Sequence, residues 1–202
     1  MACAQRGLHG LAAPSANRFG RISPTTAEHV AAEFADLLVL DGGPCAIGIE
    51  SAIVDCSRAQ PALLRPGTLS AAALEQAAGQ RLAGAHESGP PAPAAPGTLS
   101  AHYAPRAKVR LMDAKTLQTA LDVLGPDARH IAIWARARLK TTARQILLRP
   151  MPAQAEQAAR ELFATLRSFD DAQVKLIWVE TPPPDPAWAG ITDRLQRAAA
   201  SD

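Results

Sequence analysis

The sequence is poor in aromatic residues and in cysteine, and both shortages exclude common protein classes. Aromatic residues make up 4% of the 202 residues, so a platform that stacks the bases of single-stranded nucleic acid is not expected. The three cysteines, Cys3, Cys45 and Cys56, are scattered and odd in number. This usage argues against a disulfide framework and indicates a reducing, cytoplasmic environment. No two of them lie at zinc-ligand spacing, so no metal site is predicted.

Long apolar runs and strong charge are also missing. No apolar stretch approaches the roughly 18 residues that a membrane span needs, and the first residues do not resemble a signal peptide. We therefore expect no contact with a membrane. The net charge of +2 is too small to indicate nucleic-acid binding by itself, and no run of lysine and arginine occurs. The 48% of apolar residues is enough to bury a core.

The composition of one internal segment divides the chain. Residues 84–98 are rich in proline, glycine and alanine, which is typical of a semi-extended linker. Together with the residues that follow it, this linker spans 84–105. It separates a front part (residues 1–83) from a back part (residues 106–202). We find no internal repeat.

The sequence of the front part predicts short helices and strands at irregular spacing. Ser23 or Thr25 can cap a helix, with Glu28 as the partner of Thr25 in a capping box. The apolar face of this helix would consist of Val30, Phe34, Leu37 and Leu38. Further on, the pattern predicts strands at 38–40, 52–55 and 63–65, and a helix at 71–78 that begins after Ser70.

The back part alternates more regularly between strands and helices. Strands are expected at 108–112, 130–135, 145–148 and 174–179, and helices at 115–124, 154–169 and 186–199. Such alternation predicts a small α/β unit with a largely parallel sheet, with Trp134 and Trp178 in its core. No Gly-x-Gly-x-x-Gly follows the first strand, and no P-loop or nucleophile elbow occurs, so the familiar dinucleotide, nucleotide and hydrolase motifs are absent.

Several polar residues leave two interpretations open. Ser15 and Asn17 could contact a phosphate or carboxylate, or could close a turn on their own backbone. The start of the helix after Ser23 would offer free N–H groups to an anion.

Glu50 and Ser51 lie between a glycine-rich turn and a strand. Glu50 could be a buried partner or a metal-site carboxylate, and Ser51 could donate to a substrate, or both could lie exposed on a strand edge. Arg65 at a strand end suits phosphate or carboxylate binding, or else is a surface arginine. His102 and Tyr103 could fold over a site as a lid, or lie on the surface.

Taken in order, these motifs resemble a known family. The resemblance rests on Pro14-Ser15-Ala16-Asn17, Ser23-Pro24-Thr25, Asp41-Gly42-Gly43-Pro44, Gly48-Ile49-Glu50-Ser51, Val54-Asp55, Leu64-Arg65-Pro66-Gly67, Pro96-Gly97, His102-Tyr103-Ala104-Pro105, Val179-Glu180 and Asp193-Arg194-Leu195. The first motifs resemble a YrdC-type domain, and the rest resemble the linker and second domain of the two-domain threonylcarbamoyl-AMP synthases. The resemblance implies an incomplete YrdC-like twisted-sheet domain followed by a small Rossmann-like parallel α/β domain.

The family resemblance also implies an activity. Its members form threonylcarbamoyl-AMP and pyrophosphate from L-threonine, bicarbonate and ATP with Mg²⁺, and tRNA-modifying transferases then use the product to make threonylcarbamoyladenosine in tRNA. By resemblance, Ser15, Asn17, Ser23, Arg65, His102 and Tyr103 contact the nucleotide, while Ala13 and Ser51 contact threonine. No nucleophile or general base is implied, because adenylyl transfer depends on positioning and charge.

The sequence departs from the family pattern at its start. In the family, well over a hundred residues, including a Lys-x-Arg motif that clamps the phosphates, precede the loop that matches Ser15 to Asn17. Here thirteen residues precede Pro14. We therefore expect a fragment with weak or no activity alone. Two alternatives are a non-catalytic RNA-binding module and a regulatory role carried by the back part.

Overall fold

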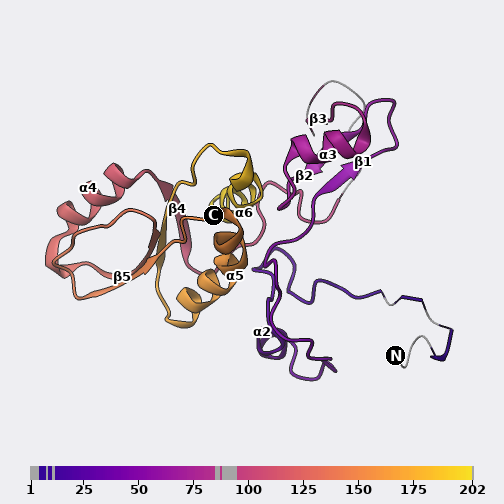
Figure 1. Ribbon diagram of the computed structural model, residues 1–202. Helices are drawn as coiled ribbons and strands as arrows, with labels where there is room; N and C mark the ends of the chain where they lie inside the picture. The colour runs from indigo at the N-terminus through magenta and orange to yellow at the C-terminus, as the bar shows by residue number, and fades with distance from the viewer. Residues whose placement is uncertain (1–4, 8, 11, 85–86, 88–94, 202) are drawn as a thin grey trace.

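The structure is a computed structural model, and it describes residues 5–7, 9–10, 12–84, 87 and 95–201. Two sheets organise the described chain, one in each part (Figure 1). The front part contains α2 (Ala27–Glu33), β1 (Ile53–Asp55), β2 (Ala62–Arg65), α3 (Ala71–Ala78) and β3 (Ala83–Gly84). The back part contains β4 (Lys108–Met112), α4 (Ala114–Leu124), β5 (Arg129–Ala135), β6 (Gln145–Pro150), α5 (Ala155–Asp171), β7 (Leu176–Glu180) and α6 (Ala189–Ala199), with 3-10 turns at Gly125–Asp127 and Pro186–Trp188.

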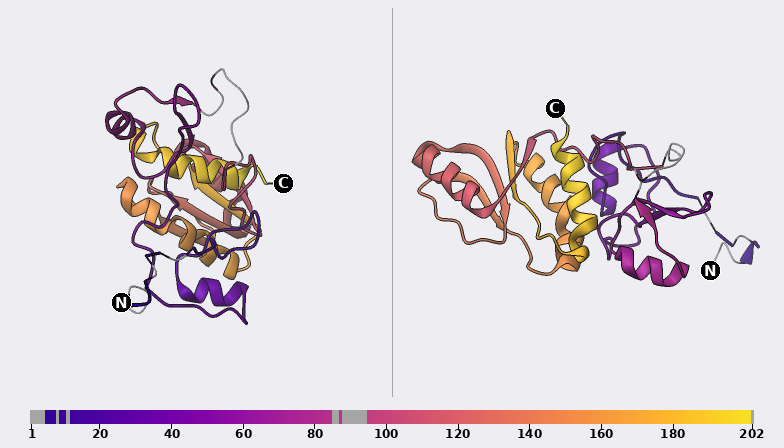
Figure 2. Two further views of the ribbon diagram at one scale, coloured as in Figure 1. Left: turned by 90° about the vertical axis from the view of Figure 1, so that its right-hand side faces the viewer. Right: turned by 90° about the horizontal axis from the view of Figure 1, so that it is seen from above.

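The back part is a four-stranded sheet in the order β4-β7-β5-β6, and every neighbouring pair is parallel. Alternate residues of β5 point to opposite faces, as a strand requires. Ile131 and Ile133 pack with α4, while Ala132 and Trp134 pack with α5 and α6. Helices therefore cover both faces of the sheet, which explains why β5 is apolar at nearly every position (Figure 2).

The elements predicted for the back part are confirmed, with ends that differ by one or two residues in most cases. The α/β class is confirmed as well, and Trp134 and Trp178 are buried as predicted. Asp113 begins α4, because its carboxylate accepts a hydrogen bond from the Thr116 N–H at 2.8 Å. No helix in the described ranges is long and apolar enough to cross a membrane.

The front part is a smaller, mixed sheet with one helix against it. β1 and β2 pair antiparallel, and β3 adds to β2 in the parallel direction. The Ser70 hydroxyl caps α3, and Gly79 ends it in the left-handed conformation at φ 68°. The strands expected near 52–55 and 63–65 and the helix at 71–78 are confirmed, whereas β3 was not predicted.

Two predictions for the front part are wrong. The first helix begins after Thr26, not after Ser23 or Thr25, since the Thr26 hydroxyl accepts the hydrogen bond from the His29 N–H. The helix ends at Glu33, so Leu37 and Leu38 lie beyond it. The expected strand at 38–40 is irregular and exposed, because no neighbouring strand in the described chain pairs with it.

The front part packs directly into the core of the back part. Ile22 and Ile49 are buried in one cluster with residues of α5 and α6. At Gly48, φ is +88°, and a Cβ atom there would lie 2.5 Å from the Arg160 Cα of α5. Only glycine allows this backbone conformation together with so close an approach. The two parts therefore share an apolar core at Ile22 and Ile49.

Candidate functional site

A buried ion pair joins the front part to the last helix. Arg194 of α6 is fully buried, and its Nε donates to Glu50 Oε2 at 3.1 Å while its Nη2 donates to the Glu50 carbonyl at 3.0 Å. Arg194 Nη1 also donates to the Pro66 carbonyl. The Ser23 hydroxyl donates to Glu50 Oε1 at 2.6 Å. Glu50 is therefore the charged partner of a buried arginine, which was one of the alternatives open for it.

Arg65 ties three segments together at the end of β2. Its Nε and Nη2 donate to the Ser51 carbonyl at 3.1 and 3.0 Å, and its Nη1 donates to the Pro96 carbonyl at 2.7 Å. The residue is 7% exposed, so the interpretation as a surface arginine is wrong. A guanidinium has five N–H donors, and in the described part of the chain two of these have no partner. No carboxylate within the described residues forms an ion pair with Arg65, so its charge is available to an anion.

Tyr103 lies at the centre of the same cluster. Tyr103 is 1% exposed, and its backbone has φ 60°. The Arg194 guanidinium lies 5.6 Å from the centroid of the tyrosine ring. A Cβ atom at Gly97 would lie 2.1 Å from the Tyr103 hydroxyl and 2.8 Å from Arg65 Nη1. The chain at 96–103 therefore wraps around the tyrosine, and the interpretation of Tyr103 as a surface residue is wrong.

His102 packs edge-on against Tyr103, with ring centroids 4.1 Å apart. Burial lowers the pKa of His102, the nearby arginines lower it further, and Glu50 opposes them. Burial also raises the pKa of Tyr103, so its phenol stays protonated at neutral pH. His102 Nδ1 and the Tyr103 hydroxyl are buried and have no hydrogen-bond partner among the described residues. Buried polar atoms are almost always paired, so two such atoms on neighbouring residues are unusual.

The remaining predicted site residues lie outside this cluster or at its rim. Ala13 and Ser15 are exposed. The Asn17 side chain donates to the carbonyls of Arg18 and Arg21 at 3.2 and 2.9 Å. Asn17 therefore closes a turn on the neighbouring backbone, which was one of its two interpretations. Ser51 is exposed, and only its carbonyl takes part in the contacts with Arg65. The structure thus gathers Ser23, Ser51, Arg65, His102 and Tyr103, but not the loop at 13–17.

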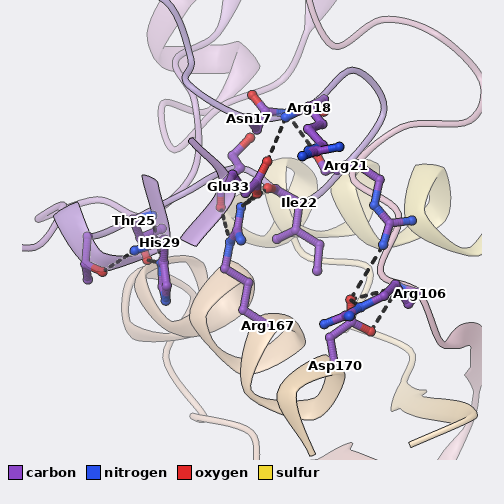
Figure 3. A network of polar contacts seen from close by, with 12 residues as sticks. Asn17, Arg18, Arg21, Ile22, Thr25, His29, Glu33, Arg106, Arg167 and Asp170 are labelled. Atoms are coloured by element: carbon purple, nitrogen blue, oxygen red, sulfur yellow. Dashed lines mark hydrogen bonds and ion pairs between the residues drawn. The ribbon is translucent and has the colours of Figure 1, made fainter. Parts of the chain in front are cut away.

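A second polar network lies on the side of α5, where a hollow of about 400 Å³ opens between the two parts (Figure 3). Arg167 donates to Glu33 and to the carbonyls of Ile22 and Ser23. Asp170 accepts the Arg106 N–H at 2.8 Å. The hollow is lined mainly by charged groups: Arg18, Arg21, His29, Glu33, Arg106, Arg167, Asp170 and Asp171, with Ile22, Ala32 and Ala104.

Sequence reasoning missed several of these residues. Arg194 was quoted only as part of a family motif, although its spacing held a signal. It lies three residues after Ile191 and next to Leu195 on the buried face of α6. A charged residue on an apolar helix face needs a buried partner. That partner, Glu50, lies 144 residues earlier in the chain, and no local pattern identifies it.

The fold and the cluster define a two-part α/β protein with an arginine-bearing site at the junction of its parts. A family model described as the C-terminal domain of threonylcarbamoyl-AMP synthase matches residues 69–200. A second model, described as telomere recombination, matches residues 2–67. The chain therefore belongs to the threonylcarbamoyl-AMP synthase family, as the motifs predicted.

Named relatives agree with the family models. A threonylcarbamoyl-AMP synthase of Bacillus subtilis is 31% identical over 207 aligned residues, which cover 94% of this chain and 57% of the relative. A threonylcarbamoyl-AMP synthase of Pyrococcus abyssi is 29% identical, and the alignment again covers 94% of this chain and 57% of the relative. The chain thus spans little more than half the length of these curated relatives.

Solved structures show the same likeness. The crystal structure of Pyrococcus abyssi Sua5 complexed with L-threonine superimposes with a TM-score of 0.76 at 28% identity, covering 92% of this chain and 56% of that one. A variant of that protein, in which a histidine and the tyrosine after it are both replaced by alanine, gives a TM-score of 0.77 at 26% identity, with the same coverage.

Proposed function

We propose that this chain supplies part of the active site of an L-threonylcarbamoyladenylate synthase. The reaction would combine L-threonine, bicarbonate and ATP into threonylcarbamoyl-AMP and pyrophosphate, for transferases that modify tRNA in the cytoplasm. The observation that carries the proposal is the cluster of Arg65, His102 and Tyr103. A buried guanidinium there lies beside two buried polar atoms that have no partner among the described residues. The family membership of the chain supports the same activity.

The cluster has the properties that adenylyl transfer requires. The amino group of threonine and bicarbonate condense to a carbamate with loss of one water, and the carbamate oxygen then attacks the α-phosphorus of ATP while pyrophosphate leaves. The protein contributes mainly position and positive charge to such a transfer. We propose that Arg65 binds the nucleotide through its two remaining N–H donors, and that His102 and Tyr103 close over it and exclude water.

The other predicted contacts complete the proposal. Ser15, Asn17 and Ser23 would approach the phosphates, and Ala13 and Ser51 the threonine. Ser23 would first have to give up its hydrogen bond to Glu50. ATP would bring Mg²⁺ with it as a substrate complex, because Mg²⁺ at such sites is held mainly by phosphate oxygens and water.

The domain limits are part of the same proposal. We propose that residues 1–83 belong to the YrdC-like catalytic domain, 84–105 form the linker that closes over the site, and 106–202 form the C-terminal domain. The L-threonine complex of the Pyrococcus abyssi relative supports threonine as one substrate. The histidine–tyrosine variant of that relative supports a role for His102 and Tyr103, since Tyr103 is the one tyrosine of this sequence.

Binding of ATP and of L-threonine to the folded chain tests the proposal directly. Isothermal titration with each ligand, with and without Mg²⁺, is compared between the unchanged chain and Arg65→Ala. Arg81→Ala is the matched control, because Arg81 is exposed and pairs only with the exposed Glu87. We expect ATP affinity to fall at least tenfold in Arg65→Ala and to stay unchanged in the control. Equal ATP affinity in Arg65→Ala, or no ligand binding by a folded chain, would overturn the proposal.

A further inference from the structure

The hollow beside α5 lies between the two parts of the chain and is separate from the cluster at Arg65 (Figure 3). Its volume of about 400 Å³ falls within the roughly 300–1,000 Å³ that is typical of small-molecule sites. None of the residues that line it is among those proposed to contact ATP or threonine. The hollow is therefore a second candidate site, and the charges in its wall indicate which ligands fit it.

The three carboxylates in the wall are either engaged by the protein or open to water. Asp170 accepts hydrogen bonds from the N–H groups of residues 106 and 107 at 2.8 and 3.1 Å. Glu33 pairs with the Arg167 guanidinium. The side chain of Asp171 is 78% exposed, so water screens its charge. The carboxylates therefore neutralise the wall only in part.

Three arginines of the wall keep most of their N–H donors. The Arg18 side chain takes part in none of the ion pairs between described residues. Arg21 donates to the Pro105 carbonyl at 3.2 Å and lies 3.8 Å from the Asp170 carboxylate. Arg106 lies 3.7 Å from the same carboxylate, and its side chain is 71% exposed. These separations are longer than a charge-assisted hydrogen bond, so the three guanidinium groups retain donors for a ligand.

His29 adds an uncharged donor to the wall. The Thr25 N–H donates to His29 Nδ1 at 3.1 Å, so the proton of the neutral ring lies on Nε2. Burial lowers the pKa of His29, and the Arg167 charge lowers it further. The carboxylates that oppose this shift are Asp171, Glu28 and Glu33. At neutral pH the imidazole is therefore uncharged, and it offers an N–H group without adding a positive charge.

The origin of these arginines explains what a ligand in the hollow would connect. Arg18 and Arg21 belong to the front part, whereas Arg106 follows the linker in the back part. A single carboxylate or chloride ion is too small to reach donors on both sides of a hollow of about 400 Å³. A molecule with two separated anionic groups can contact both parts at once.

We propose that the hollow binds a small organic dianion, such as a phosphate ester or a dicarboxylate. Arg18 and Arg21 would hold one end and Arg106 the other, since a guanidinium presents a planar fork of donors to a phosphate or a carboxylate. The wall carries four arginines against three carboxylates, and a concave site concentrates such an excess of positive charge. This site is separate from adenylate synthesis and does not depend on the site at Arg65.

Isothermal titration of the full chain with glycerol 3-phosphate and with succinate tests the proposal. Glycerol and succinamide are the uncharged counterparts of these two probes. The hollow variant is Arg18→Gln/Arg106→Gln, and the matched control is Arg138→Gln/Arg144→Gln. The control removes the same charge at two exposed arginines that do not line the hollow. Circular dichroism confirms that each variant is folded, and Arg18→Gln alone replaces the double change if that variant does not fold.

We expect at least one dianion to bind the unchanged chain and the control equally well. It should bind the hollow variant about tenfold more weakly or worse, because two charge-assisted contacts are lost. Tighter binding of glycerol 3-phosphate would identify a phosphate ester as the ligand class, and tighter binding of succinate a dicarboxylate. No binding of either dianion, equal binding of an uncharged counterpart, or equal weakening in the control would overturn the proposal.

Arg65→Ala separates this site from the proposed nucleotide site. A dianion in the hollow should bind to Arg65→Ala as it binds to the unchanged chain, whatever that change does to the affinity for ATP. A dianion that loses affinity in Arg65→Ala and keeps it in the hollow variant would be bound at Arg65, and the proposal for the hollow would be wrong.

Discussion

Arg194 offers the sharpest test of how the two parts are held together. The proposed change is Arg194→Met, which keeps much of the side-chain length and removes the charge. It deletes the contacts to the Glu50 carboxylate, to the Glu50 and Pro66 carbonyls, and the placement of the guanidinium over Tyr103. Glu50 then keeps only the Ser23 hydroxyl as a partner.

The expected loss of stability follows from these contacts. Removing one partner of a buried ion pair costs about 3–5 kcal/mol when the other charge stays buried. The Glu50 side chain is 24% exposed, so water screens part of its charge, and the lower end of that range applies. The two carbonyls add about 1 kcal/mol each if they stay dry. We therefore expect a loss of about 5 kcal/mol, a large share of the roughly 5–15 kcal/mol of a typical domain.

Urea unfolding and hydrogen exchange measure this loss and locate it. Arg197→Ala is the comparison, because Arg197 lies one turn later on α6, and its partner Asp193 keeps Arg194 as a second cationic partner. It should lose no more than about 1 kcal/mol. In Arg194→Met, amides of 48–65 should lose protection while those of β5 keep it. A loss below 1 kcal/mol, or equal loss of protection in β5, would refute the reasoning.

Two further predictions concern the same junction. A Cβ at Gly190 would lie 2.5 Å from the Gly67 carbonyl oxygen, so Gly190→Ala should cost about 1–3 kcal/mol by urea unfolding, although alanine favours the helix. Gly42→Ala, which meets no atom within 4 Å, is the control, and an equal effect of the two would contradict the steric argument. The lowered pKa of His102 means that the folded chain prefers the neutral imidazole. Its contribution to stability is present above about pH 6.5, the unfolded value, and is lost as the pH falls toward the folded pKa. An NMR titration of the imidazole with a midpoint above 6.5 would contradict this direction.

The sequence predicted the back part well because its signals are local. β5 is apolar from Ile131 to Ala135, and Asp113 and Gly125 mark the two ends of α4. Such periodicity and capping act within a few residues. The start of the first helix was predicted too early. Ser23 and Thr25 offer the same capping hydroxyl as Thr26, and the sequence does not distinguish between them.

The candidate site was predictable only in part, because its contacts join distant segments. Arg65 and Tyr103 were singled out, and the structure buries both. The loop at 13–17 lies apart from them, and the pairing of Glu50 with Arg194 spans 144 residues. The strand expected at 38–40 shows the converse error, since apolar residues favour a strand only where another strand can pair with them.

The shared core has a consequence for how the chain can be divided. Ile22 and Ile49 pack against α5 and α6, so cleavage within 84–98 would cut the backbone without separating the pieces. Each piece alone would expose to water the apolar surface that the other now covers. The linker is thus a boundary in composition, but it is not what holds the two parts together. A nicked chain should migrate as a single species.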